Sequence, residues 1–190
     1  MSMILTPSQT VGPFFHFGLT DKHSIGHIAD PQAQGERVHL KCRVLDGDGM
    51  PLNDAMVEIW QANAEGKYNH PEDRQQKPIE PAFYGFGRAA TNEGGNCEFE
   101  TIKPGRVSGP GNTLQAPHLN VAIFARGMLK QLYTRIYFFG DPANQEDSVL
   151  AMVPAKRRAT LLAQPDGSRP GTWLFDLHLQ GEQETVFFDV

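Results

Sequence analysis

Hydrophobic and polar residues alternate with a period of two in several short stretches after residue 36. This pattern predicts half-buried β-strands. The strands that we expect span residues 37–44, 56–62, 97–102, 118–126, 132–139, 158–164, 173–179 and 185–190. In the clearest of them, 118–126, the odd-numbered residues are all apolar and form one face, whereas His118, Asn120 and Arg126 belong to the other.

Only one segment, 144–153, suits a helix, because two acidic residues lie near its start, where they favour the helix dipole. Many short strands, regular turns and little helix predict an all-β fold. We expect an antiparallel β-sandwich with long loops and at most one or two short helices. Residues 1–36 show little periodicity and predict an extended, structureless N-terminal arm. Its aromatic cluster, 14–17, must bury itself either on this chain or on a partner chain, and we expect the arm to pack on a partner chain.

The 190 residues are 39% hydrophobic and 21% charged, which suits a single soluble domain spanning 1–190. A net charge of −5 argues against nucleic acid as a partner. The sequence offers neither an apolar run of about 20 residues nor a secretory signal, so we expect a cytoplasmic protein without membrane contact. Cys42 and Cys97 lie in apolar runs, which favours buried, reduced thiols and leaves a disulfide as the alternative.

Three motifs follow one another at a characteristic spacing: WQANAEGKY (60–68), TIKPGRV (101–107) and PHLNVAIFARG (117–127). With TPSQTVGPF near the start and GEQETVFFDV at the end, they span nearly the whole chain. In this order and spacing the chain resembles the intradiol ring-cleavage family of non-haem iron(III) dioxygenases.

Catalytic chains of that family hold ferric iron with two tyrosines and two histidines. Tyr68 matches the first tyrosine, and Val107 stands at the second. His118 matches the first histidine, and Asn120 replaces the second. Fe(III) prefers anionic oxygen donors completed by imidazole, so two of the four positions are wrong in kind. We expect no metal here and a polar structural cluster of Tyr68, His118 and Asn120 instead.

The resemblance is to the iron-free α chains of the family, which pair with a related β chain. It implies a large α/β oligomer in which Fe(III) is bound by the β chain and not by this one. The implied reaction is cleavage of protocatechuate by O2 to 3-carboxy-cis,cis-muconate at the shared interface, with this chain inactive alone. It also implies that Thr10, Gly12, Pro13 and Arg126 contribute to the substrate pocket of the β chain.

The chemistry of the substrate supports a role for Arg126, because a guanidinium binds a carboxylate such as that of protocatechuate. In a straight strand, eight residues would place Arg126 roughly 26 Å from His118. Arg126 must therefore serve a different site from the one around His118.

Two alternatives compete with this interpretation. A self-sufficient iron enzyme would have to recruit other ligands, such as His16, His70 or Asp73. A non-catalytic, transthyretin-like β-sandwich module would bind a protein or a small ligand, but the aromatic arm and the PHLNVAIFARG strand are not expected in such a module.

Overall fold

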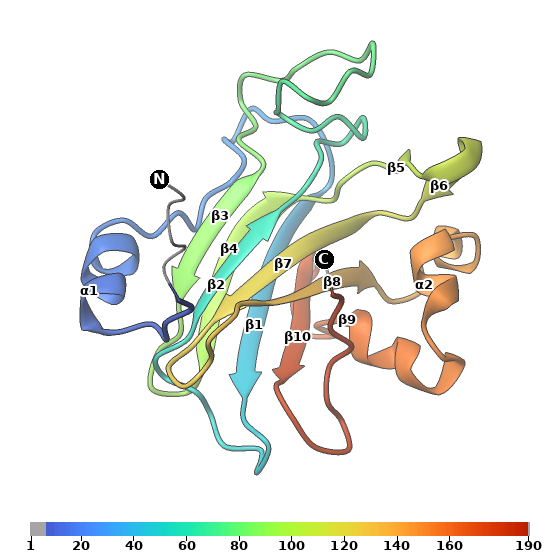
Figure 1. Ribbon diagram of the computed structural model, residues 1–190. Coiled ribbons are helices and arrows are strands. Elements are labelled where there is room, and N and C mark those ends of the chain that lie inside the picture. The colour runs from blue at the N-terminus through green and yellow to red at the C-terminus, as the bar shows by residue number, and fades with distance from the viewer. Residues whose placement is uncertain (1–6, 190) are drawn as a thin grey trace, which may run out of the picture.

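Figure 1 shows the computed structural model, which describes residues 7–189. Its main strands are β1 (Arg37–Leu45), β2 (Met56–Trp60), β3 (Phe86–Ala90), β4 (Asn96–Ile102), β7 (His118–Phe124), β8 (Leu132–Phe138), β9 (Leu162–Pro165) and β10 (Thr172–His178). These eight form one sheet in the order β3-β2-β7-β8-β9-β10-β1-β4. A separate two-stranded sheet pairs β5 (Val107–Ser108) with β6 (Leu114–Gln115).

The large sheet folds over on itself into two layers. The front layer consists of β3, β2, β7 and β8, and the back layer of β9, β10, β1 and β4. The layers are joined through β8 and β9, and β3 approaches β4 on the opposite side, so the sheet is nearly closed. The all-β, sandwich-like prediction is confirmed. The sheet is mixed, however, because β1–β10 and β8–β9 are parallel pairs.

The period-two pattern explains the core between the layers. The buried inner residues include Val57, Ile59, Leu119, Val121, Ile123, Leu40, Val44, Phe99, Phe175 and Leu177. Cys42 and Cys97 are partners in the register of β1 and β4, and both are buried free thiols. Since the inner face of each strand is apolar, the alternate residues face outward, and on the front layer they form the site described below.

Helices differ most from the expectation. The structure has α1 (Pro13–His16), η1 (Phe17–Asp21), η2 (Pro110–Asn112), η3 (Pro142–Gln145), α2 (Ser148–Met152) and η4 (Ala155–Leu161). The prediction of a single helix over 144–153 was wrong in extent. Asp147 caps α2 by accepting from the backbone N–H groups of Val149 and Leu150, so the helix begins at Ser148.

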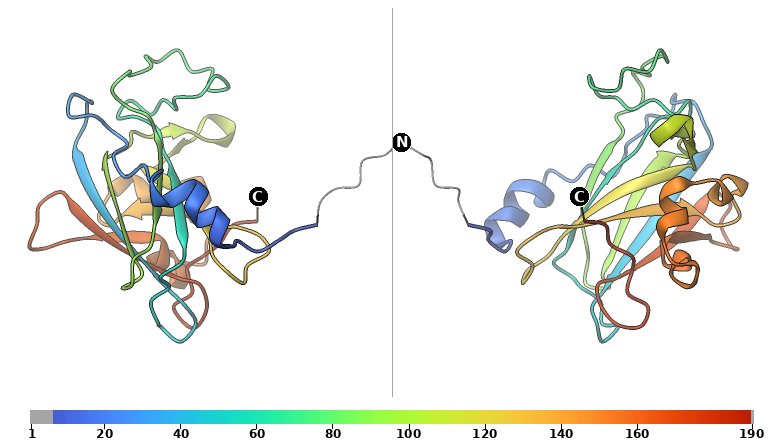
Figure 2. Two further views of the ribbon diagram at one scale, coloured as in Figure 1. Left: turned by 90° about the vertical axis from the view of Figure 1, so that its left-hand side faces the viewer. Right: turned by 45° about the vertical axis from the view of Figure 1, so that its right-hand side comes forward.

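The N-terminal segment is not structureless, because α1 and η1 occupy residues 13–21. Pro13 at the first helical position fixes φ and needs no N–H partner, which starts the turn. The ring of Phe15 packs on Phe124 of β7 with centroids 5.6 Å apart, whereas Phe14 (87%) and Phe17 (59%) are exposed. The arm therefore covers one end of its own sheet, and Figure 2 shows α1 from that side.

Several strand ends also differ. The strand predicted over 118–126 stops at Phe124, because residues 125–128 form a turn with Gly127 at φ +89°. The first four residues of the strand predicted over 158–164 belong to η4. In place of the last predicted strand there is one bridge, between Tyr133 and Phe188, and residue 190 lies outside the described residues. No helix within 7–189 is long and apolar enough to cross a membrane.

Candidate functional site

The four predicted ligand positions gather at one end of the outer face of the front layer. We call Tyr68, Val107, His118 and Asn120 the degenerate site. Tyr68 and Val107 line one pocket of about 410 Å³ together with Trp60. Asn120 lines a neighbouring pocket of about 540 Å³, which Trp60 also borders. Segments far apart in sequence are thus brought together around the indole ring of Trp60.

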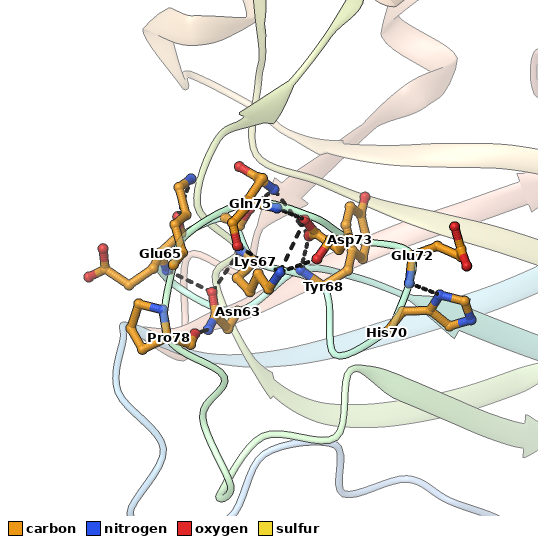
Figure 3. Close-up of polar contacts among 11 residues, drawn as sticks. Asn63, Glu65, Lys67, Tyr68, His70, Glu72, Asp73, Gln75 and Pro78 are labelled. Atoms are coloured by element: carbon orange, nitrogen blue, oxygen red, sulfur yellow. Dashed lines mark hydrogen bonds and ion pairs between the residues drawn. The ribbon is translucent and has the colours of Figure 1, made fainter.

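The loop that carries Tyr68 is organised by Asn63, as Figure 3 shows. The side-chain oxygen of Asn63 accepts from the backbone N–H groups of Glu65 (3.0 Å) and Lys67 (2.9 Å). Gly66 has φ +75°, and a Cβ there would lie 2.0 Å from the carbonyl oxygen of Arg106. The glycine of EGKY therefore lets this loop touch the KPGRV segment, which places Tyr68 beside Val107.

A buried ion pair fixes the backbone of Tyr68 (Figure 3). Lys67 and Asp73 are 3.3 Å apart, with side chains only 6% and 9% exposed. Asp73 also accepts from the Tyr68 N–H at 2.8 Å and from Gln75. Burial raises the pKa of Asp73, but the hydrogen bonds from Gln75, Tyr68 and Lys67 outweigh it and leave the pKa lowered. The position of Tyr68 is thus set by ordinary polar contacts.

The phenol of Tyr68 is held by neutral groups. Its ring stacks on Trp60 with centroids 5.9 Å apart and planes 14° from parallel. Asn120 Nδ2 donates to the phenol oxygen at 3.2 Å and to the Trp60 carbonyl at 3.3 Å. Burial raises the pKa of Tyr68, and the Asn120 hydrogen bond and the charge of Arg135 offset this only in part. The phenol is therefore protonated at neutral pH.

His118 is held as a buried neutral imidazole. Its Nδ1 lies 2.7 Å from the carbonyl oxygen of Ala116, which can only accept, so Nδ1 carries a proton. The residue is 3% exposed. Burial, followed by the charge of Arg135, lowers the pKa of His118 to about 4. The ring packs against Tyr137 on β8 with centroids 5.7 Å apart.

Sequence reasoning missed three residues beside this cluster: Arg135, Tyr137 and Asp147. Arg135 Nη1 donates to Gln115 at 2.6 Å and to the Tyr137 hydroxyl at 3.4 Å. Tyr137 in turn donates to Asp147 at 3.1 Å. The available signal was the alternation in LYTRIYFF, which puts Arg135 and Tyr137 on the face that pairs with Asn120 and His118.

The groups present do not suit a ferric ion. Val107 supplies no donor atom, and Asn120 turns an N–H toward Tyr68 rather than a lone pair. Arg135 shifts the pKa of both Tyr68 and His118, so its positive charge acts where a cation would have to lie. Within residues 7–189, moreover, no group of three or more histidine, cysteine, aspartate or glutamate side chains is arranged to hold a metal.

The replacement ligands considered above are also committed elsewhere. His70 and Asp73 line the same pocket as Tyr68, but the Asp73 carboxylate pairs with Lys67. The Nδ1 atom of His70 accepts from the N–H of Glu72 at 3.2 Å. His16 lies on the arm, where its ring bonds Thr20 at 2.6 Å.

The second predicted group lies at the other end of β7. The Thr10 hydroxyl accepts from the N–H of Gly127 at 2.7 Å, which brings the arm beside Arg126. Arg126 pairs with Asp54 at 3.0 Å, and its side chain is 77% exposed. Gly12 caps α1, and Pro13 begins it. The pocket lined by Thr10 shares no residue with the two pockets of the degenerate site, so the structure forms two separate groups.

Comparison with known protein families shows that residues 11–181 match the model of a dioxygenase family, described simply as "Dioxygenase". The chain belongs to the intradiol dioxygenase family. Membership in this family excludes the transthyretin-like module considered above.

Within the intradiol dioxygenases, the chain is 43% identical to the protocatechuate 3,4-dioxygenase alpha chain of Burkholderia cepacia, over 97% of each chain. It is 35% identical to the beta chain from the same organism, over 83% of this chain and 70% of that one. Among solved structures, hydroxyquinol 1,2-dioxygenase from Pseudomonas putida DLL-E4 aligns with a TM-score of 0.65 at 22% identity, covering 96% of this chain and 68% of that one. The structural likeness shows a shared fold.

Proposed function

We propose that this chain is the α subunit of an α/β protocatechuate 3,4-dioxygenase, in which the β subunit holds the ferric iron. The observation that carries this proposal is the 43% identity to an alpha chain over 97% of both sequences, against 35% to a beta chain over a shorter span. The donor groups of the degenerate site support an iron-free chain, because a valine, an amide and a protonated phenol make a poor set for Fe(III).

The part that this chain plays in catalysis would lie with Thr10, Gly12, Pro13 and Arg126. An exposed guanidinium beside an anchored arm can reach a neighbouring subunit, and a carboxylate-bearing catechol gains directed hydrogen bonds from it. The exposed rings of Phe14 and Phe17 give the arm apolar surface for packing on the β subunit.

The first test concerns the iron. The full-length chain, purified alone and as the α/β complex, is analysed for metal content and for tyrosinate-to-iron absorption. We expect iron and colour in the complex and neither in the chain alone. Stoichiometric, coloured iron in the chain alone would contradict the assignment of the metal to the β subunit.

The second test concerns Arg126. In the purified complex, Arg126→Ala should leave the iron content intact and lower kcat/KM for protocatechuate about tenfold or more, the cost of one charged hydrogen bond. Arg169→Ala removes an equal charge from the exposed turn between β9 and β10 and serves as the matched control. Deleting residues 1–14 should also lower activity or prevent assembly. If Arg126→Ala has the same kcat/KM as the parent complex, Arg126 has no role in the pocket.

A further inference from the structure

The pocket of about 540 Å³ that Asn120 lines opens on the outer face of the front layer, and the proposed function assigns no ligand to it. Its walls come from β2, β3, β7 and β8, from α2, and from residues 188–189 near the C-terminus. This volume falls in the range of small-molecule sites. Its polar wall includes Asn120, Arg135 and two carboxylates, and much of its apolar wall is formed by Trp60, Phe86, Met152 and Phe188.

Arg135 forms no salt bridge with a carboxylate in the part of the chain that the structure describes. Its partners at hydrogen-bond distance are the Gln115 amide and the Tyr137 hydroxyl, both neutral. By contrast, Arg43 and Arg88 each pair with a carboxylate. Gln115 and Tyr137 therefore orient the guanidinium without neutralising it, and a half-buried guanidinium in that state attracts an anion.

The nearby carboxylates do not supply that anion. Glu58 is occupied by Arg88, at 2.7 Å from Nε and 2.5 Å from Nη2. Asp147 accepts from the backbone of α2, from the Ala116 N–H and from the Tyr137 hydroxyl. Asp189 also lines the pocket, but it is exposed, so solvent and salt screen its charge.

We propose that this pocket binds a small aromatic carboxylate, whose carboxylate pairs with Arg135 and whose ring packs against Trp60 and Phe86. The ring of such a ligand would bury apolar surface against the aromatic side chains of the pocket, and its carboxylate would accept hydrogen bonds from the guanidinium of Arg135. The field of Arg135 also lowers the pKa of His118, which shows that its charge is felt within the cluster. This inference concerns the chain's own pocket and does not depend on the dioxygenase role.

The test measures ligand binding to the full-length chain, purified without the β subunit, by titration calorimetry. Benzoate should bind with saturation. Benzamide, which lacks the charge, and acetate, which lacks the ring, should each bind at least tenfold more weakly. Arg135→Gln should raise the Kd of benzoate at least tenfold, whereas Arg169→Gln, an exposed arginine far along the chain, should leave it unchanged.

Two results would overturn the proposal: no saturable benzoate binding by the wild-type chain, or benzoate affinity that Arg135→Gln leaves intact. The thermal transition of Arg135→Gln identifies a misfolded variant. In that case the wild-type series decides, because equal affinity for benzoate and benzamide rules out the ion pair. Since the β subunit is absent, failure here leaves the proposed α-subunit function standing.

Discussion

His118 should make this chain less stable in mild acid, and replacing it with asparagine should remove that sensitivity. The folded protein holds the imidazole neutral, with its pKa lowered from 6.5 to about 4. The unfolded chain binds a proton at this ring below about pH 6.5. Between these two values the unfolded state carries more protons, so stability falls as the pH falls.

The size of the effect follows from the two pKa values. At about pH 5 the ring is mostly protonated in the unfolded chain and mostly neutral in the folded one, which costs about 2 kcal/mol relative to pH 7.5. Well below pH 4, where the ring is protonated in both states, the protein is about 3 kcal/mol less stable than at pH 7.5 because of this residue. In His118→Asn the side-chain amide can still donate to the Ala116 carbonyl, but nothing titrates in this range. The variant loses some packing at every pH, and that loss cancels in the comparison.

Urea unfolding of both proteins at about pH 5 and pH 7.5, followed by circular dichroism, gives the required double difference. We expect the wild-type chain to lose about 2 kcal/mol more than His118→Asn on going to pH 5. Val121→Ala, a buried change on the same strand that does not titrate, should weaken the protein equally at both pH values. A double difference below about 0.5 kcal/mol would refute the argument that burial and Arg135 keep the imidazole neutral.

Two further predictions concern the loop that carries Tyr68. Gly66→Ala should lower stability by about 3 kcal/mol or more, because the new Cβ would meet the Arg106 carbonyl. The control Gly49→Ala has nearly the same φ (+76°) but open space around the new Cβ, and it should cost about 1–2 kcal/mol. Melting temperatures that fall equally in the two variants would contradict this prediction. Lys67→Met should cost about 3 kcal/mol in urea unfolding, since it leaves Asp73 buried without its cation, and adding Asp73→Asn should recover part of the loss.

The strands were predictable because one face of each strand is buried in the core, so that apolar residues occupy every second position in the sequence. The Leu119, Val121 and Ile123 row is apolar for this reason, and its strand was found. β5 and β6 have two residues each, too few for any period, and β3 contains Gly87 and two alanines, which carry little strand preference. The helix boundary at Ser148 depended on Asp147, whose cap a hydrophobic pattern does not reveal.

The candidate site was predictable only where the family motifs matched. Those motifs identified Tyr68, Val107, His118 and Asn120. In the structure Asn120 donates a hydrogen bond to Tyr68, whereas His118 bonds the carbonyl of Ala116. Arg135 was missed because its importance arises from the pairing of β7 with β8, which sets it opposite Asn120. Such a pairing joins residues that lie 15 positions apart and is fixed by the turn between the strands.

The same contacts show that the polar groups of the degenerate site find hydrogen-bond partners within the protein itself. Where a metal organises a site, its binding energy contributes to folding, and its ligands are left unsatisfied when it is removed. Four buried side-chain atoms among the described residues have no hydrogen-bond partner, and they belong to Arg106, Asn144, Ser148 and Arg157. None of them belongs to the degenerate site. Because its polar side chains are bonded to backbone groups and to one another, the cluster would persist as a structural element in the proposed iron-free α subunit.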